Sequence, residues 1–125
     1  MAASEKPTVD IPAGPPPTDL ELDDLTVGDG PEAAAGKTVD VHYVGVAFES
    51  GRQFDASWDR GDPLSFKLGT GQVIAGWDQG VAGMKVGGRR RITIPPHLAY
   101  GKQGAGGVIG PDATLVFVVD LVSVG

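Results

Sequence analysis

The feature of this sequence that most restricts its fold is a series of short apolar runs of period two, separated by turns that contain glycine. Apolar and polar side chains alternate over residues 39–43, and again over residues 64–68. Successive side chains of a strand point to opposite faces, so each run predicts a strand with one buried face. The chain has 20 glycines in 125 residues without a three-residue period, which excludes collagen and predicts many tight turns.

The other apolar runs complete an α+β pattern. Further strands are predicted over residues 20–25, 44–48, 53–55, 89–94 and 114–124. Residues 49–52 carry turn signals that predict a hairpin, and residues 97–113 form a long glycine-rich loop. Ile74, Trp77, Val81 and Met84 are spaced by three and four residues, which predicts the one helix, over residues 74–84. We therefore expect an antiparallel sheet that curls around one short helix.

The N-terminal segment differs in composition from the rest of the chain. Five of the ten prolines fall in the first 17 residues, where they remove amide donors and favour extended backbone. We interpret residues 1–18 as a Pro-rich tail and residues 19–125 as one folded domain. Val9 and Ile11 are apolar and alternate, which leaves open that the segment lies along the domain.

Charge and composition exclude several classes of function. Residues 1–32 carry a net charge of −7 and the remainder +1, whereas binding to a nucleic-acid backbone requires a basic face. Arg89–Arg91 is the only basic cluster, and we interpret it as a solvated strand edge. The absence of cysteine excludes disulfides and thiol nucleophiles. No apolar membrane span and no leader are visible, so we expect a cytoplasmic monomer with no metal, cofactor, nucleic-acid or membrane partner.

Motifs for bond-breaking chemistry are weak. His42 and His97 lie on different predicted elements, with no serine or carboxylate spaced as a triad. Asp55 and Asp59 form a candidate carboxylate pair, which keeps a sugar-binding or hydrolytic domain as a distant alternative.

The aromatic residues are more informative. Tyr43, Phe54, Trp77 and Phe117 occupy apolar-phase positions of separate predicted elements, and Tyr100 lies in the long loop. These side chains either form ordinary core or line an apolar cup.

Seven collinear segments resemble one family. They are Val41–Gly45, Gly51–Ser57, Gln72–Val81, Gly83–Gly87, Ile94–Pro96, Leu98–Gly101 and Ala113–Phe117. Their order and intervals are similar to those of the FKBP-type peptidyl-prolyl cis-trans isomerases, and the similarity extends from about Leu20 to Val124.

The resemblance implies an antiparallel half-barrel sheet wrapped around one short helix, with an apolar pocket that receives a proline ring. It places eight residues in that pocket: Tyr43, Phe54, Val73, Ile74, Trp77, Tyr100, Ile109 and Phe117. Trp77 would form the floor, and the Ile74 amide and Tyr100 hydroxyl would bind substrate carbonyls. Asp55 would face the twisted imide from the rim, held by Arg60.

The resemblance also implies rotation of X-Pro bonds during protein folding, without a cofactor, and binding of macrolides such as tacrolimus and rapamycin. A binding or chaperone module with incidental catalysis is the alternative. Four positions depart from the family pattern: Leu64, Gln72, Ala105 and Gly110. Leu64 is nevertheless expected to contact the ligand, and the departures bear on ligand affinity and sequence preference.

Overall fold

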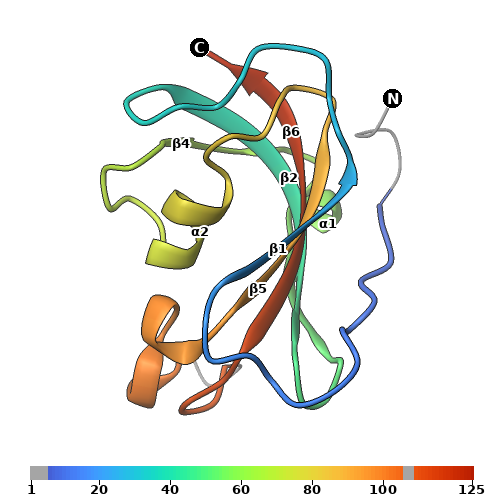
Figure 1. Cartoon of the computed structure of the whole chain (residues 1–125), viewed down its shortest axis with the longest axis vertical. Coiled ribbons are helices and arrows are strands. Elements are labelled where there is room, and N and C mark those ends of the chain that lie inside the picture. Colours follow the sequence, from blue (N-terminus) through green and yellow to red (C-terminus); the bar gives the residue numbers. More distant parts are fainter. Residues whose placement is uncertain (1–5, 106–108) are drawn as a thin grey trace.

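The computed structural model describes residues 6–105 and 109–125 (Figure 1). The strands are β1 (Glu21–Thr26), β2 (Thr38–Ala47), β3 (Gln53–Ala56), β4 (Leu64–Lys67), β5 (Arg89–Ile94) and β6 (Leu115–Val124). The helices are α1 (Ser57–Arg60) and α2 (Ala75–Gly80), with two 3₁₀ turns, η2 (Pro96–Leu98) and η3 (Gly101–Gln103). No helix in the described ranges is long and apolar enough to cross a membrane.

All pairings in the sheet are antiparallel, as predicted. The strand order is β1-β5-β6-β2-β3, and β4 pairs with another part of β2. The hairpin predicted around residues 49–52 is confirmed, because Val44 pairs with Ala56 and Gly45 with Asp55. The sheet stays open at its ends and curls around α2 (Figure 1), which confirms the predicted α+β architecture.

The helix α2 is shorter than predicted, and it packs very closely against the sheet. A Cβ atom on Gly76 would lie 2.5 Å from Ile94 Cγ2, and one on Gly80 would lie 2.9 Å from Ile92 Cγ2. Only glycine lets the helix backbone approach this closely. After Gly80 the chain turns away, and Gly83 adopts a φ of 87°, so the helix does not continue to residue 84 as the apolar spacing suggested.

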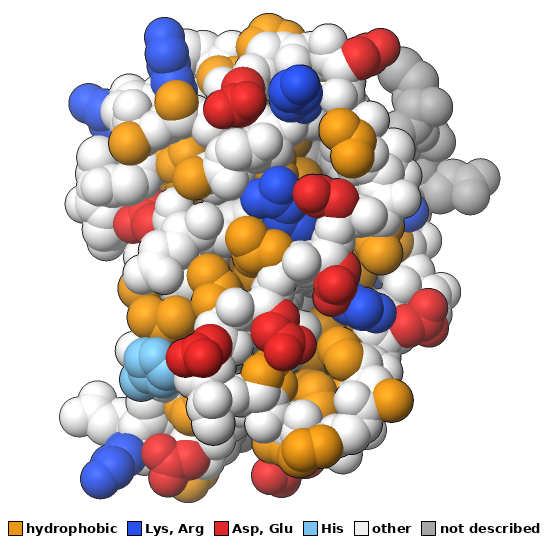
Figure 2. Space-filling model, viewed as in Figure 1, with side chains coloured by type: hydrophobic (Ala, Val, Ile, Leu, Met, Phe, Trp, Pro, Cys, Tyr) orange, Lys and Arg blue, Asp and Glu red, His pale blue; other side chains and the backbone are white. Residues whose placement is uncertain are grey.

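The interpretation of the three arginines as a solvated edge is wrong, because β5 lies between β1 and β6. Each arginine instead pairs with a carboxylate on a neighbouring strand: Arg89 with Asp120, Arg90 with Asp24, and Arg91 with Asp23. Arg90 is buried and also donates to the Gly80 and Ala82 carbonyls at the end of α2. On the face of the molecule that Figure 2 shows, Lys and Arg side chains lie among Asp and Glu side chains. The arginines therefore join strands and helix rather than forming a basic patch.

Candidate active site

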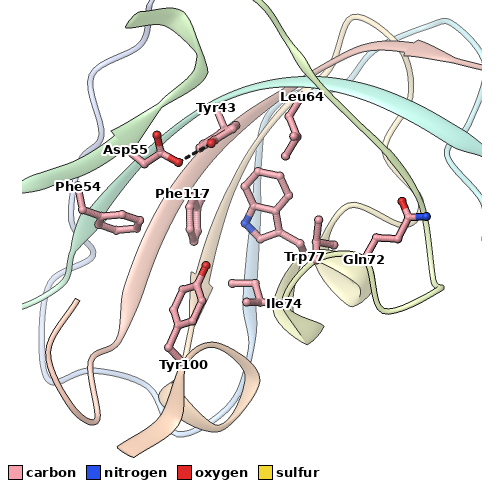
Figure 3. A pocket seen from close by; sticks show the side chains of 10 residues that line it. Tyr43, Phe54, Asp55, Leu64, Gln72, Ile74, Trp77, Tyr100 and Phe117 are labelled. Carbon is pink, nitrogen blue, oxygen red and sulfur yellow. Dashed lines mark hydrogen bonds between the residues drawn. The ribbon is translucent and has the colours of Figure 1, made fainter. Parts of the chain in front are cut away.

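Four aromatic side chains from four elements meet in one cup between α2 and the sheet (Figure 3). Trp77 of α2 is only 4% exposed, and its ring centre lies 4.8 Å from that of Tyr43 and 5.2 Å from that of Phe117. Phe54 of β3 lies 5.5 Å from Phe117. All three contacts are edge-to-face, the arrangement that ring quadrupoles favour. The rings therefore hold one another in fixed orientations.

The cup encloses a cavity of about 440 Å³, within the range of small-molecule sites. Its lining consists of Tyr43, Phe54, Asp55, Leu64, Gln72, Val73, Ile74, Trp77, Tyr100 and Phe117. A Cβ atom on Gly45 would lie 2.7 Å from both Phe54 Cζ and Phe117 Cε1, so glycine there makes room for both rings. Trp77 Nε1 points toward Phe117 in Figure 3 and has no hydrogen-bond partner among the described residues. Apart from this one N–H, the aromatic rings make the base of the cavity apolar.

Polar groups gather at the rim in a three-residue network. The Tyr43 hydroxyl donates to Asp55 Oδ2 at 2.5 Å. Arg60 donates from Nη1 to Asp55 Oδ1 at 2.6 Å and from Nη2 to the Tyr43 hydroxyl at 2.8 Å. Because β3 leads directly into α1, Asp55 and Arg60 come from adjacent elements and reach the same tyrosine. This network fixes the carboxylate at the cavity mouth.

Burial raises the pKa of Tyr43 from its ordinary value near 10 to about 12, and the hydrogen bond to the Asp55 carboxylate adds to this effect. Hydrogen bonds to Tyr43 and then to Asp55 raise the pKa of Arg60. Tyr43 therefore stays protonated at neutral pH and donates to Asp55.

The loop before α2 brings Val73 and Ile74 to the cavity, and side chains brace it. The Asp78 carboxylate accepts hydrogen bonds from Gly69 N at 2.8 Å and Gly71 N at 3.0 Å. Gln72 Oε1 accepts from Lys67 N at 2.8 Å. The Ile74 carbonyl accepts from the first turn of α2, whereas its N–H has no partner among the described residues. The loop thus presents a free amide donor beside the cup.

Tyr100 enters the cavity from the loop between β5 and β6. The residue is 40% exposed, and its hydroxyl points into the cup in Figure 3. Partial burial, followed by the negative charge of Asp55, raises the pKa of Tyr100. The hydroxyl bonds to no other group in residues 6–105 or 109–125, so it is a second donor available to a ligand.

The two tyrosines of the chain supply a direct test of this electrostatic arrangement. Both have raised pKa values, so neither should be half-ionised at pH 10 in the folded protein. The stability contributed by protonated Tyr43 is fully present below pH 10 and is lost as the pH rises through about 12. Titration of tyrosinate absorbance should show this delay, and the same titration in denaturant should give midpoints near pH 10. In the Tyr43→Phe variant, Tyr100 is the one remaining tyrosine. A midpoint near pH 10 for the folded variant would contradict the raised pKa of Tyr100.

A family model described as FKBP-type peptidyl-prolyl cis-trans isomerase matches residues 30–122. The chain belongs to this isomerase family.

Individual isomerase relatives extend the match. The FK506-binding protein of Streptomyces anulatus is 67% identical over 121 residues, which cover 96% of this chain and 98% of the relative. The probable FK506-binding protein of Corynebacterium glutamicum is 54% identical over 119 residues, covering 95% and 98%. The crystal structure of AtFKBP13 superposes with a TM-score of 0.80 at 42% identity, covering 88% of this chain and 96% of that one.

The structure brings nine of the eleven predicted site residues to the lining of the cavity. The other two, Arg60 and Ile109, do not line it. Arg60 lies behind the lining and donates hydrogen bonds to Asp55 and Tyr43, which do line the cavity. Ile109 is 8% exposed and belongs to the adjoining core, where its backbone pairs with Ala105. The role expected for each residue in binding stays a prediction.

Two alternative sites do not assemble. Ser57 does meet His42, with 2.8 Å between Oγ and Nδ1, but Ser57 is fully buried and also accepts the Tyr43 amide. It is therefore held within the fold rather than at the cavity. Asp59 bonds to Lys6 and Gln53 and does not line the cavity beside Asp55, so the two carboxylates do not flank a substrate cleft.

The bracing of the loop by Asp78 was missed from sequence. The two glycines of the Gly69–Gly71 turn both adopt positive φ, which leaves amides directed toward the start of α2. An acidic residue in the first turn of a helix after such a turn is the signal that could have identified it. Gln72 was named only as a departure from the family pattern, yet it lines the cavity.

Proposed function

We propose that the cavity binds the proline ring of a polypeptide and accelerates rotation about the X-Pro bond, with unfolded or folding chains as substrates. The observation that carries this proposal is the separation of an apolar aromatic base from a rim of hydrogen-bonding groups. A proline ring is apolar, whereas the carbonyls that flank it need donors. The cup matches both halves of such a ligand.

The reaction requires no nucleophile. The barrier to rotation of an amide is about 18–20 kcal/mol because twisting removes the resonance of the planar bond. An enzyme lowers this barrier by binding the twisted form more tightly than either planar form. A twisted amide is less polar, so its transfer into the aromatic cup costs less desolvation than transfer of the planar amide. Trp77, Phe117 and Phe54 supply that environment.

The rim fixes the chain on either side of the rotating bond. The unpartnered Ile74 N–H and the Tyr100 hydroxyl donate to substrate carbonyls, which anchors one side while the other turns. Asp55, held by Tyr43 and Arg60, faces the twisted imide from the rim in a fixed orientation.

We also propose that macrolides such as tacrolimus and rapamycin occupy the same cup. Two relatives of this chain are named FK506-binding proteins, and the residues that line the cavity here form an apolar surface large enough for a ring substituent of such a ligand.

The test is a protease-free assay of isomerisation in a short Leu-Pro peptide, with and without each macrolide. We expect the protein to accelerate isomerisation of the peptide. The macrolide should reduce this acceleration in proportion to the fraction of cavities that it occupies. Macrolide binding without acceleration would favour a binding module and overturn the catalytic proposal. Acceleration that persists at saturating macrolide would overturn the shared site.

A further inference from the structure

The N-terminal segment runs along the face of the sheet opposite α2 (Figure 1). We refer to residues 6–11 as the strap. Pro7, Val9 and Ile11 are half-buried, whereas Lys6, Thr8 and Asp10 are exposed. This period of two is the pattern of an extended chain with one side against a surface. The alternation of Val9 and Ile11 left open that this segment lies along the domain, and in the structure it does.

The surface under the strap is a separate apolar cluster, formed by Val46, Phe48 and Val116. Phe117 faces the cavity, so its neighbour Val116 faces the other side of β6, and Val46 is its register partner on β2. Val9 and Ile11 pack against this cluster. The strap thus covers apolar surface on the back of the strands that carry the cup.

Polar contacts tie both ends of the strap to the sheet and α1. Arg91 Nη1 donates to the Asp10 carbonyl at 3.1 Å. Lys6 Nζ lies 2.8 Å from Asp59 Oδ1, and the other oxygen of that carboxylate accepts from Gln53 Nε2 at 2.8 Å. Asp59 therefore links the strap to β3 as well as to α1.

The two elements that Asp59 links to the strap, β3 and α1, also carry rim residues. Asp55 lies on β3 two residues after Gln53, and Arg60 follows Asp59 at the end of α1. We propose that the strap is a positioning element for the active site. Val9 and Ile11 hold the strap against β2 and β6, and Lys6, through Asp59, holds α1 and β3 so that Arg60 meets Asp55. The catalytic part of this inference rests on the function proposed above.

The comparisons fit a role for this segment outside the common domain. The family model begins at residue 30, whereas the Streptomyces and Corynebacterium relatives align over 96% and 95% of the chain. These alignments must include most of the strap. The Neisseria meningitidis relative is matched over 84% of the chain and 95% of its own length. That relative is therefore a shorter chain than this one.

The first experiment removes the apolar contacts. In the full chain, Val9→Ser with Ile11→Ser should lower the midpoint of thermal unfolding by about 5 °C, and kcat/KM for the Leu-Pro peptide should fall about threefold. The matched control is Leu25→Ser with Val27→Ser, which removes similar apolar groups that are 50% and 73% exposed. An unfolding midpoint equal to that of the control would overturn the strap as a cover.

The second experiment separates positioning from stability. Lys6→Met should lower kcat/KM about twofold, and Lys6→Arg should restore it because the ion pair with Asp59 is kept. The control is Lys37→Met, which replaces an exposed lysine that does not line the cavity and should leave kcat/KM unchanged. A kcat/KM that is unchanged in both Lys6→Met and the Val9→Ser/Ile11→Ser variant would overturn the positioning role. Absence of activity in the unmutated chain would count against the proposed function instead, while the unfolding midpoints would still test the cover.

Discussion

We expect the Asp55→Val substitution to lower kcat/KM for prolyl isomerisation by about tenfold or more while the protein stays folded. A tenfold fall corresponds to a loss of about 1.4 kcal/mol of transition-state stabilisation. The carboxylate accepts hydrogen bonds from Tyr43 and Arg60 at the cavity mouth, and its side chain is 41% exposed. Valine suits a strand position, so β3 is retained. The loss therefore falls on the rim rather than on the fold. Steady-state kinetics of a Leu-Pro peptide, with circular dichroism of the same sample, measure it.

The matched control for this prediction is Asp62→Val. Asp62 is exposed just beyond α1 and does not line the cavity, so its kcat/KM should equal that of the unmutated protein. Equal activities for the two variants would show that the rim carboxylate has no part in rotation.

Arg89→Met should lower the free energy of unfolding by about 3 kcal/mol. Arg89 donates to both oxygens of Asp120, at 2.6 Å and 2.8 Å, and the Asp120 side chain is fully buried in β6. Removal of the guanidinium leaves a carboxylate inside the sheet without its cation. Urea denaturation followed by tryptophan fluorescence measures the change.

Two further variants make the result specific. Arg91→Met, on the same strand, should cost less than about 1 kcal/mol because its partner Asp23 is 48% exposed. Arg89→Met combined with Asp120→Leu should recover part of the lost stability, since no unpaired charge remains. A loss at Arg91 equal to that at Arg89 would show that burial of the partner does not set the cost.

Local patterns in the sequence were sufficient for the strands and for the inward phase of the aromatic residues. Alternation over residues 39–43 and 64–68 predicts which side chains face the core, because that choice depends only on the pleat of each strand. The aromatic residues were located for the same reason, since each occupies the inward phase of its own element. Their meeting in one cavity followed from the family resemblance, because the spacing of each aromatic residue alone favoured an ordinary place in the core.

Features that depend on contacts between distant segments were not predicted. The turn α1 has four residues, too few to show helical periodicity. The partners of Arg89 and Arg90 lie 31 and 66 residues away, so the strand appeared as an edge when considered alone. The close approach of α2 to Ile92 and Ile94 is likewise a contact between distant segments, and the apolar spacing of the helix gives no sign of it.

The order of the strands has a consequence for synthesis of the protein on the ribosome. β6 lies between β5 and β2, although both of those strands precede it in the chain. A nascent chain that ends before residue 115 therefore has no strand to join its two halves, and it exposes the apolar faces of both. Because pairing between strands so distant in sequence is slow, the sheet should assemble only after β6 has left the exit tunnel. An isomerase with this topology completes its own folding after translation of its central strand.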